Sequence, residues 1–241
     1  APFEGGGGVG GPGGRSLMGM TAHGASVYVL FGASSEGFVN DFFELDTSVT
    51  PPIWRDLGAT AVGDIPEKRA DAGVAAVSGA IYIFGGNLRL GVYSDDLKVY
   101  NVTTGVWSDL SHLPNTPSGR HRMSFESLGG AAGGVFAKIV MFGGQQIGRN
   151  SMDELWELDV SGVPVWTTTG YSSTPSWTSL DALTLQKPSG RRGAGFAAVN
   201  GSSLIIIGGI GEGQVYFDDV RELQSKFQTD CPSGTYKERM R

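Results

Sequence analysis

The sequence is poor in charged residues, in histidine and above all in cysteine. Its 241 residues include three histidines and a single cysteine, Cys231, so no disulfide can form within the chain. Charged side chains make up 17% of the residues, below the quarter typical of soluble domains, and the net charge is −6. Nucleic-acid binding needs a basic face, so this charge balance argues against a nucleic-acid partner. No apolar run reaches the ~18 residues of a membrane helix, so we expect no membrane span in this segment.

Glycine, by contrast, is abundant, with 39 residues. Several of these glycines end a sequence pattern that occurs four times. The apolar runs that end in this way are Val27 to Phe31-Gly32, Ala80 to Phe84-Gly85-Gly86, Ile139 to Phe142-Gly143-Gly144 and Leu204 to Ile207-Gly208-Gly209. A period of about fifty to sixty-five residues is typical of a repeat protein. Each copy also contains an arginine, a strand of small residues and an acidic residue followed by an apolar one.

The second copy shows most clearly that each repeat contains four short strands. The expected strands are 73–77, 80–84, 96–100 and 106–110. The continuous apolar run of residues 80–84 has the length of a strand buried on both faces. In the first copy, Ala33 takes the place where we expect the second glycine.

Tryptophan and acidic residues recur at fixed places in the copies. Trp54, Trp107 and Trp166 follow the acidic position at similar offsets, and we expect them to fill the space between neighbouring sheets. The acidic pairs are Asp95-Asp96, Asp153-Glu154 and Asp218-Asp219. Catalytic carboxylates would not recur in every copy, so we interpret these pairs as caps of backbone amides where the third strand begins.

This combination of residues resembles the Kelch repeat, in which each copy forms one blade of a β-propeller. The resemblance runs from about Arg15 to Val220. It implies an all-β fold, a Kelch-type β-propeller with four recognisable blades of four-stranded antiparallel sheet. Kelch propellers usually have more than four blades, and an open propeller would leave exposed edge strands, so we expect these blades to be part of a larger propeller. The expected repeats are about 15–57, 66–110, 117–169 and 188–227.

The two ends of the sequence lie outside the expected repeats. Residues 1–14 are rich in glycine and are interpreted as a linker or disordered segment. Residues 228–241 are interpreted as a tail, and the residues around Cys231 resemble the start of the ephrin-receptor-like cysteine-rich modules of some extracellular proteins. The alternative is an incidental thiol in a frayed tail. The first interpretation predicts an extracellular location and the second a cytoplasmic one. Glycosylation motifs at Asn101 and Asn200 are compatible with secretion.

Four arginines stand at the same place in every copy, just before the first strand of the blade. They are Arg15, Arg69, Arg120 and Arg191. Equivalent arginines in several Kelch proteins converge on one face of the propeller and hold acidic peptide segments, a task suited to the forked guanidinium group. The alternative is that each arginine binds backbone carbonyls of a neighbouring blade.

The loops that follow the Gly-Gly positions form the second candidate surface, because they vary between copies. They span residues 33–40, 87–94, 145–151 and 210–217, and the blade topology predicts that all four lie on one face. The candidate contact residues in these loops, of types enriched in interfaces, are Arg89, Tyr93, Gln145, Arg149, Asn150, Gln214 and Tyr216. The connection at 167–187 is longer than the fold needs, and such loops are often functional or disordered.

We therefore expect a protein-interaction module whose partner is a protein, and the family resemblance implies an acidic peptide segment as one candidate ligand. The rival hypothesis is an enzyme with its site at the propeller pore, like the Kelch-like oxidases or the specifier and isomerase proteins that use this fold. Copper radical oxidases need a Tyr-Cys crosslink and histidine ligands, and the only cysteine lies outside the repeats. His23, His112 and His121 lack metal-ligand spacing, and we predict no cofactor and no catalytic residue.

Overall fold

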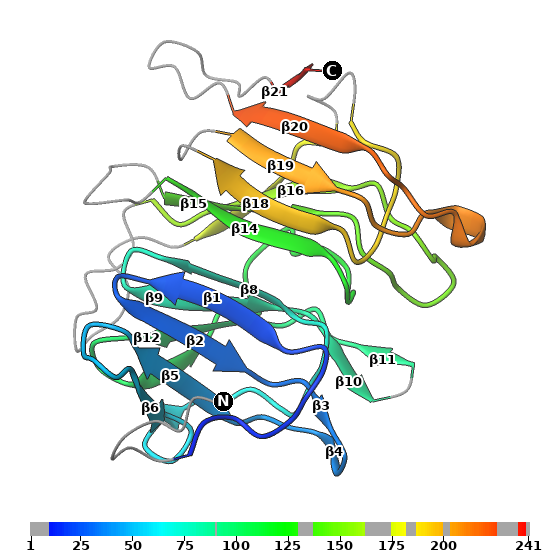
Figure 1. The fold of residues 1–241 in the computed structure, drawn as a ribbon. Coiled ribbons are helices and arrows are strands. Elements are labelled where there is room, and N and C mark those ends of the chain that lie inside the picture. The colour runs from blue at the N-terminus through cyan, green and yellow to red at the C-terminus, as the bar shows by residue number, and fades with distance from the viewer. Residues whose placement is uncertain are drawn as a thin grey trace. The chain divides into compact units, whose positions relative to one another are not determined.

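The computed structural model describes residues 10–89, 91–129, 137–161, 175–181, 187–199, 203–225 and 236–239. In these residues the regular structure consists mainly of β-strands, with a short 3-10 helix, η2 (Glu212–Gln214). The main strands form four antiparallel sheets, one for each sequence repeat (Figure 1), so the predicted all-β fold with four blades is confirmed. None of the helical structure in this part of the chain has the length and apolar character needed to cross a membrane.

The chain divides into two units, Ala1–Ser111 and His112–Arg241, and each unit contains two blades. In the first unit, blade 1 has the order β1 (Gly19–His23), β2 (Ser26–Leu30), β5 (Phe42–Asp46) and β6 (Ile53–Asp56). Blade 2 has the order β8 (Gly73–Val77), β9 (Ala80–Phe84), β12 (Leu97–Asn101) and β13 (Val106–Asp109). A short strand, β7 (Val62–Gly63), extends blade 2 by pairing in parallel with β13.

The second unit repeats this order twice. Blade 3 consists of β14 (Ser124–Gly129), β15 (Ala137–Phe142), β16 (Leu155–Asp159) and β17 (Ser176–Ser179). Blade 4 consists of β18 (Gly195–Val199), β19 (Ser203–Ile207), β20 (Val220–Ser225) and β21 (Tyr236–Arg239). The backbone of β21 pairs with β20, so part of the segment interpreted as a tail forms the fourth strand of this blade. Cys231 and Asn200 lie outside the described residues.

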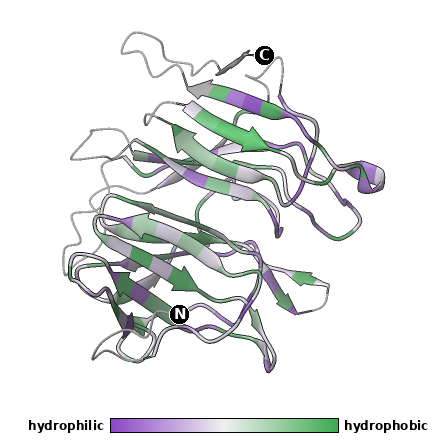
Figure 2. Cartoon of the chain, in the orientation of Figure 1, coloured by the Kyte–Doolittle hydropathy of each residue, from purple (hydrophilic) through white to green (hydrophobic). Residues whose placement is uncertain are grey.

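In each unit the core lies between the two blades. In the first unit Tyr28, Leu30 and Phe42 of blade 1 pack in one cluster with Ile81 and Ile83 of blade 2. The second unit has the equivalent cluster of Val140, Phe142 and Leu155 with Leu204 and Ile206. The second strand of each blade contributes the most, and Figure 2 shows the hydrophobic colour on β2 and β19. A lone four-stranded sheet cannot bury its apolar faces, so within each unit one blade packs on the other.

Tryptophan occupies one position of the fourth strand in three blades, but one of the three differs from the prediction. Trp54 pairs with Leu45, Trp107 with Tyr100 and Trp177 with Leu158, and these partners are equivalent residues of the third strand. Trp166 was expected at this place and lies outside the described residues. Trp177, which the sequence placed in a long connection, is a buried residue of blade 3, as is Leu180 just after β17.

Candidate functional site

The four repeat arginines hold the acidic residue of their own blade. The residue pairs are Arg15 with Asp41, Arg69 with Asp96, Arg120 with Glu154 and Arg191 with Asp219. Arg69 shows the full pattern: Nη1 and Nη2 donate to the two carboxylate oxygens of Asp96 at 2.6 and 2.8 Å. Nη1 also donates to the carbonyl of Gly85 at 2.9 Å, and Nε donates to the carbonyl of Glu67 at 3.1 Å. One guanidinium therefore ties together the start of the blade, the end of its second strand and the start of its third.

These contacts recur in every blade with little change. Nη1 of the other three arginines donates to the carbonyls of Phe31, Gly143 and Gly208. Their Nε atoms donate to the carbonyls of Gly13, Ser118 and Ser189, in each case two residues earlier in the chain. The acidic residues are therefore partners of the arginines, and the interpretation that they act mainly as caps of backbone amides is wrong.

Burial decides how these arginines can act. Arg69, Arg120 and Arg191 are 1%, 0% and 1% exposed, and each has a carboxylate partner. A buried charge that loses its partner is strongly destabilising, so a ligand carboxylate would have to replace one that is already in place. The arrangement favours the structural alternative, with one correction: the side chains bind carbonyls of their own blade. The hydrogen bonds to the preceding blade are made by the backbone, where the amides of Gly32 and Gly144 donate to the carbonyls of Arg69 and Arg191, both at 2.9 Å.

The equivalent carbonyls also correct the alignment of the first copy. Leu30 pairs with Phe42 as Phe84 pairs with Leu97, so Phe31 is equivalent to Gly85 and Gly32 to Gly86. The prediction that Ala33 takes the second glycine position is therefore wrong. Phe31 adopts φ +59°, close to the +66° of Gly85, in the left-handed region that favours glycine. Its side chain is buried, and the guanidinium of Arg69 lies 5.7 Å from its ring centroid, a cation–π arrangement.

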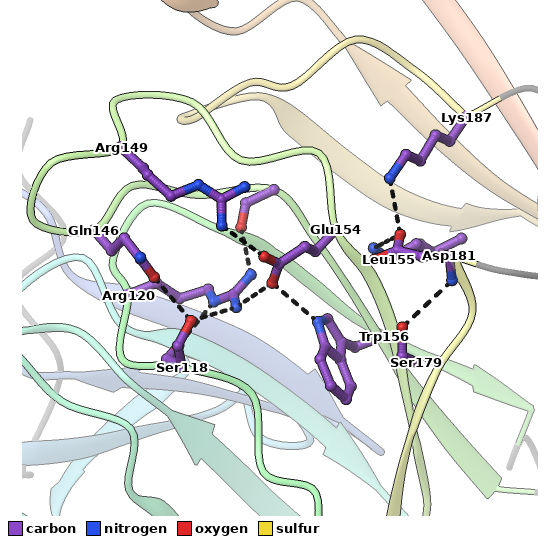
Figure 3. A network of polar contacts seen from close by, with 11 residues as sticks. Ser118, Arg120, Gln146, Arg149, Glu154, Leu155, Trp156, Ser179, Asp181 and Lys187 are labelled. Atoms are coloured by element: carbon purple, nitrogen blue, oxygen red, sulfur yellow. Dashed lines mark hydrogen bonds and ion pairs between the residues drawn. The ribbon is translucent and has the colours of Figure 1, made fainter.

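Blade 3 extends the pattern into a larger polar network, drawn in Figure 3. Glu154 accepts hydrogen bonds from Arg120 Nη2 at 2.7 Å, from Arg149 Nη1 at 2.8 Å and from Trp156 Nε1 at 3.3 Å. Burial by itself would raise the pKa of Glu154. The hydrogen bonds and positive charge of Arg120, followed by those of Arg149, outweigh the burial and lower this pKa from 4.5 to about 2. Glu154 is therefore ionised throughout the physiological range and is not suited to donate a proton.

Within each unit, the loops after the Gly-Gly positions place other predicted site residues near one another. In the first unit, Arg89 and Tyr93 lie on the hairpin of β10 (Asn87–Arg89) and β11 (Val92–Tyr93), with Arg89 exposed. The corresponding loop of blade 1 forms the smaller hairpin of β3 (Ala33–Ser34) and β4 (Gly37–Phe38). Figure 1 shows both hairpins on the same side of the first unit.

In the second unit, the loop of blade 3 is in contact with that of blade 4. Gln145 Nε2 donates to Asn150 Oδ1 at 3.3 Å, and Arg149 belongs to the Glu154 network. Gln214 lies in η2 of the blade 4 loop, and the neighbouring Tyr216 is 75% exposed. Ser151 Oγ donates to the carbonyl of Ile210, which joins the two loops directly.

Arg192 is a site residue that the sequence reasoning missed. It is 5% exposed and fixes the two loops of the second unit to each other. Its Nη1 donates to the carbonyl of Asn150 at 2.7 Å, and its Nη2 donates to Gln214 Oε1 at 3.1 Å. The equivalent residues of the other copies are Ser16, Ala70 and His121, which pair in the same way with the residue after the second glycine. The sequence signal was the Arg191-Arg192 doublet, since only the fourth copy has a second arginine there.

Each unit has a cleft at the same place, between the loop of its first blade and the loop of its second. In the first unit a cleft of ≈ 650 Å³ is lined by Asn40, Glu67, Lys68, Leu88, Arg89 and Val92. In the second unit a cleft of ≈ 470 Å³ is lined by Ser151, Asp153, Ser189, Gly190, Glu212, Val215 and Phe217. Asn40 and Asp153 hold equivalent places, as do the residue pairs just before Arg69 and Arg191. The two clefts are built from equivalent positions of the blades but differ in charge. The first is lined by two cations and the second by none.

Two further expectations concern metals and glycosylation. The described part of the chain contains no group of three His, Cys, Asp or Glu residues arranged to hold a metal ion. Asn101, in the first glycosylation motif, is 2% exposed, and its Oδ1 accepts hydrogen bonds from the amides of Thr103 and Thr104 at 2.8 and 2.9 Å. This side chain stabilises the turn after β12 and is not presented to an enzyme.

Comparison with known proteins agrees with these blades. Residues 7–136 match the KLHDC2/KLHL20/DRC7 Kelch-repeats domain, which covers more than half of the chain. The chain belongs to the Kelch-repeat family. It is also similar to Kelch domain-containing protein 3 of Rattus norvegicus and of Mus musculus, each 26% identical over 170 residues. These alignments cover 61% of this chain and 39% of each relative, so the match spans well under half of the length of the curated proteins. Kelch domains are typically protein-binding.

Proposed function

We propose that this Kelch chain is a protein-interaction module that binds its partner through the clefts between successive blades. The observation that carries the proposal is the occurrence of a cleft at the same inter-blade place in both units. The blade positions around the cleft are the same in both units, whereas the side chains that line it differ. Repeat scaffolds bind through the elements that vary between copies, so the lining is where specificity is expected.

The cleft of the first unit favours an acidic peptide segment that also carries an apolar side chain. Lys68 and Arg89 are exposed at its rim, and neither forms an ion pair with any residue in the described ranges. Leu88 and Val92 supply apolar surface between them. Glu67 is the one acidic residue of the lining, so two cations face one anion. Free cations beside apolar surface suit an acidic ligand, because no internal partner has to be displaced.

The repeat arginines have a different part in this proposal from the one that the family resemblance implied. They hold the loops in place, and the ligand meets Lys68, Arg89 and the other loop residues. Tyr93, Gln145, Asn150, Gln214 and Tyr216 remain candidates for contact, and Tyr216 is 75% exposed.

The test is selection of peptides from a random displayed library on the purified chain. We expect enrichment of acidic sequences, and we expect a selected peptide to lose at least tenfold in affinity, about 1.4 kcal/mol, when Lys68→Gln and Arg89→Gln are combined. Arg55→Gln is the matched control, because Arg55 is a half-exposed cation on β6 that is not part of the cleft lining. Enriched peptides without acidic residues, or equal loss with Arg55→Gln, would contradict the proposal.

We further propose that this role is one of binding and not of catalysis. The support is the state of the repeated carboxylates: Glu154 and Asp219 are held ionised, with pKa values of about 2, by the arginines beside them. Metal analysis of the purified protein separates this proposal from the oxidase alternative. Stoichiometric copper or iron would overturn it.

A further inference from the structure

The clefts of the two units are bordered by loops of the same length, so their linings can be compared position by position. In blade 2 the amide of Ser94 donates to the carbonyl of Gly86 at 2.9 Å. In blade 4 the amide of Phe217 donates to the carbonyl of Gly209, also at 2.9 Å, and closes a loop with the same number of residues. The equivalent lining positions that carry a charge in at least one cleft are Asn40 with Asp153, Glu67 with Ser189, Lys68 with Gly190 and Arg89 with Glu212.

Each of these positions has a different charge in the two clefts. In the second cleft a glutamate takes the place of Arg89, and a glycine takes the place of Lys68. An aspartate takes the place of Asn40, and only the exchange of Glu67 for a serine removes negative charge. The first cleft therefore has two cations and one anion, and the second has two anions and no cation. Because charges across an interface are complementary, the two linings suit ligands of opposite charge.

The carboxylates of the second cleft are available to a ligand. Glu212 is exposed, and its side chain forms no ion pair within the described part of the chain. Asp153 is 48% exposed and already meets an ammonium group, since Lys187 Nζ lies 3.2 Å from its Oδ2. The same Nζ lies 3.0 Å from Asp181 Oδ1, so Lys187 is shared between two carboxylates. Asp153 therefore keeps an oxygen for a second donor.

The two arginines that follow Gly190 in the chain do not occupy these carboxylates. Arg191 pairs with Asp219, and Arg192 donates to Gln214 Oε1 and to a backbone carbonyl. Both guanidinium groups are buried, and neither is part of the cleft lining. The negative charge of the lining is therefore not neutralised by the cations nearest to it in the sequence.

The second cleft also has an apolar surface, but a different position supplies it. Gly211 stands where the first cleft has Leu88, and Phe217 stands where blade 2 has Ser94. A Cβ atom on Gly211 would come within 2.7 Å of the Phe217 ring, so the ring occupies the space that a side chain there would need. Val215, which also lines the cleft, is 55% exposed. Lysine and arginine lay their aliphatic stems along apolar surface and keep the charged end at polar groups, so this lining suits a long basic side chain.

We propose that the cleft of the second unit binds a lysine or arginine side chain from a basic segment of the protein partner. The charged end meets the carboxylates of Asp153 and Glu212, and the stem lies along Val215 and Phe217. This inference rests on the proposed function, since it takes the clefts between blades to be the binding sites. It gives the second cleft a ligand of the opposite charge to that of the first, so a partner that fills both clefts carries an acidic and a basic segment.

The first experiment measures the binding of a fluorescently labelled lysine–alanine peptide to the purified chain by fluorescence anisotropy. Glu212→Gln combined with Asp153→Asn is expected to weaken binding about tenfold, because both carboxylates that meet the ammonium group are lost. The matched control is Glu36→Gln combined with Asp95→Asn, which removes the same charge from exposed residues that line neither cleft. Circular dichroism checks that each variant folds.

The control separates a site from a general attraction between a basic peptide and an acidic chain. The control variant should change the affinity little. Equal losses in the two double variants would overturn the proposal, and so would an unmodified chain that does not bind the lysine–alanine peptide.

Charge reversal tests whether the second cleft sets the charge of its ligand. Glu212→Arg is made in a chain that also carries Lys68→Gln and Arg89→Gln, so that the first cleft supplies no cation. This chain should bind the lysine–alanine peptide more weakly than its parent and a glutamate–alanine peptide of the same length more tightly. An unchanged preference for the lysine–alanine peptide overturns the assignment.

The two peptides also separate this inference from the proposed function. If the glutamate–alanine peptide binds through Lys68 and Arg89 but the lysine–alanine peptide does not bind, the inference about the second cleft fails and the proposed function stands. If neither peptide loses affinity when the residues of its own cleft are changed, both fail.

Discussion

Replacing Glu154 with glutamine tests the idea that the arginine–carboxylate pairs are the frame of the blades. Glutamine keeps the shape of the side chain but removes its charge. Arg120, which is 0% exposed, would then stay buried without a carboxylate. Because removal of one partner leaves an uncompensated buried charge, breaking such a pair typically costs about 3–5 kcal/mol. We expect Glu154→Gln to lower the free energy of unfolding of the second unit substantially.

The pKa of Glu154 gives a second value for the stability that this pair contributes. Its decrease from 4.5 to about 2 on folding corresponds to roughly 3 kcal/mol of stability at neutral pH. Because the folded pKa lies below the unfolded one, this contribution is fully present above about pH 4.5 and is lost as the pH falls toward about 2. The difference in stability between the unmodified chain and the variant should therefore be about 3 kcal/mol at pH 7 and should shrink steadily as the pH falls below 4.5.

The assay is urea unfolding followed by hydrogen exchange of peptides from each unit, since a chain with two units need not unfold in one step. Peptides from β15 and β16 should lose protection in the variant, and peptides from β9 and β12 should not. Asp41→Asn is the matched control, because Asp41 is 33% exposed and its pair with Arg15 is better solvated, so it should cost less. A pH-independent difference between the unmodified chain and Glu154→Gln would refute the reasoning, as would equal costs for the two substitutions.

Two other substitutions test the corrected positions. Phe31→Gly should be more stable than Phe31→Ala by about 1 kcal/mol, because glycine relieves the left-handed backbone conformation that alanine retains, although both lose the buried ring. Equal denaturation midpoints would mean that the backbone is not constrained there. Trp177→Ala should destabilise the second unit by about 3–5 kcal/mol, as Trp107→Ala should destabilise the first, since both side chains are 3% exposed. A thermal or urea midpoint that Trp177→Ala leaves unchanged would contradict its place in the core.

The strands themselves could be predicted because their sequence pattern depends on local physics. The run at residues 80–84 is apolar throughout, and all five residues of β9 are buried on one face or the other of the sheet. Glycine ends the run where the backbone needs a positive φ, as at Gly85 and Gly86. Both signals lie within a few residues of the strand, so one sequence is enough to locate it.

Contacts between distant residues were harder to predict. Phe31-Gly32 and Phe84-Gly85 have the same sequence and seem to be equivalent. Only the pairing of Leu30 with Phe42 shows that the alignment of the first copy is shifted by one residue. Trp166 has the expected offset from Glu154, but the chain between the third and fourth strands of blade 3 is longer than in the other blades, so Trp177 takes the position instead. In each case the missing information was the register of a strand pair.

The arginine–acid pairs could have been predicted from the sequence. An arginine and an acidic residue recur in all four copies, at places next to strands that are expected to be buried. A buried charge is tolerated when an opposite charge meets it, so two opposite charges that repeat with the same period are expected to be partners. The arginines and the acidic residues had seemed to have separate roles, because neither set names its partner until the two periods are compared with each other.

The pairing also supports the proposal that binding specificity lies outside the repeat arginines. The guanidinium of Arg69 already donates four of its five N–H groups to a carboxylate and two carbonyls, and the same contacts are needed in every copy to hold the blade together. Residues that repeat are therefore constrained by the fold, whereas Lys68 and Arg89 in one cleft and Asp153 and Glu212 in the other are free to differ. On the proposed function, two clefts with equivalent backbone positions and different charges suit chemically different segments of a partner, so exchanging the charges of one cleft should change its ligand without unfolding its blades.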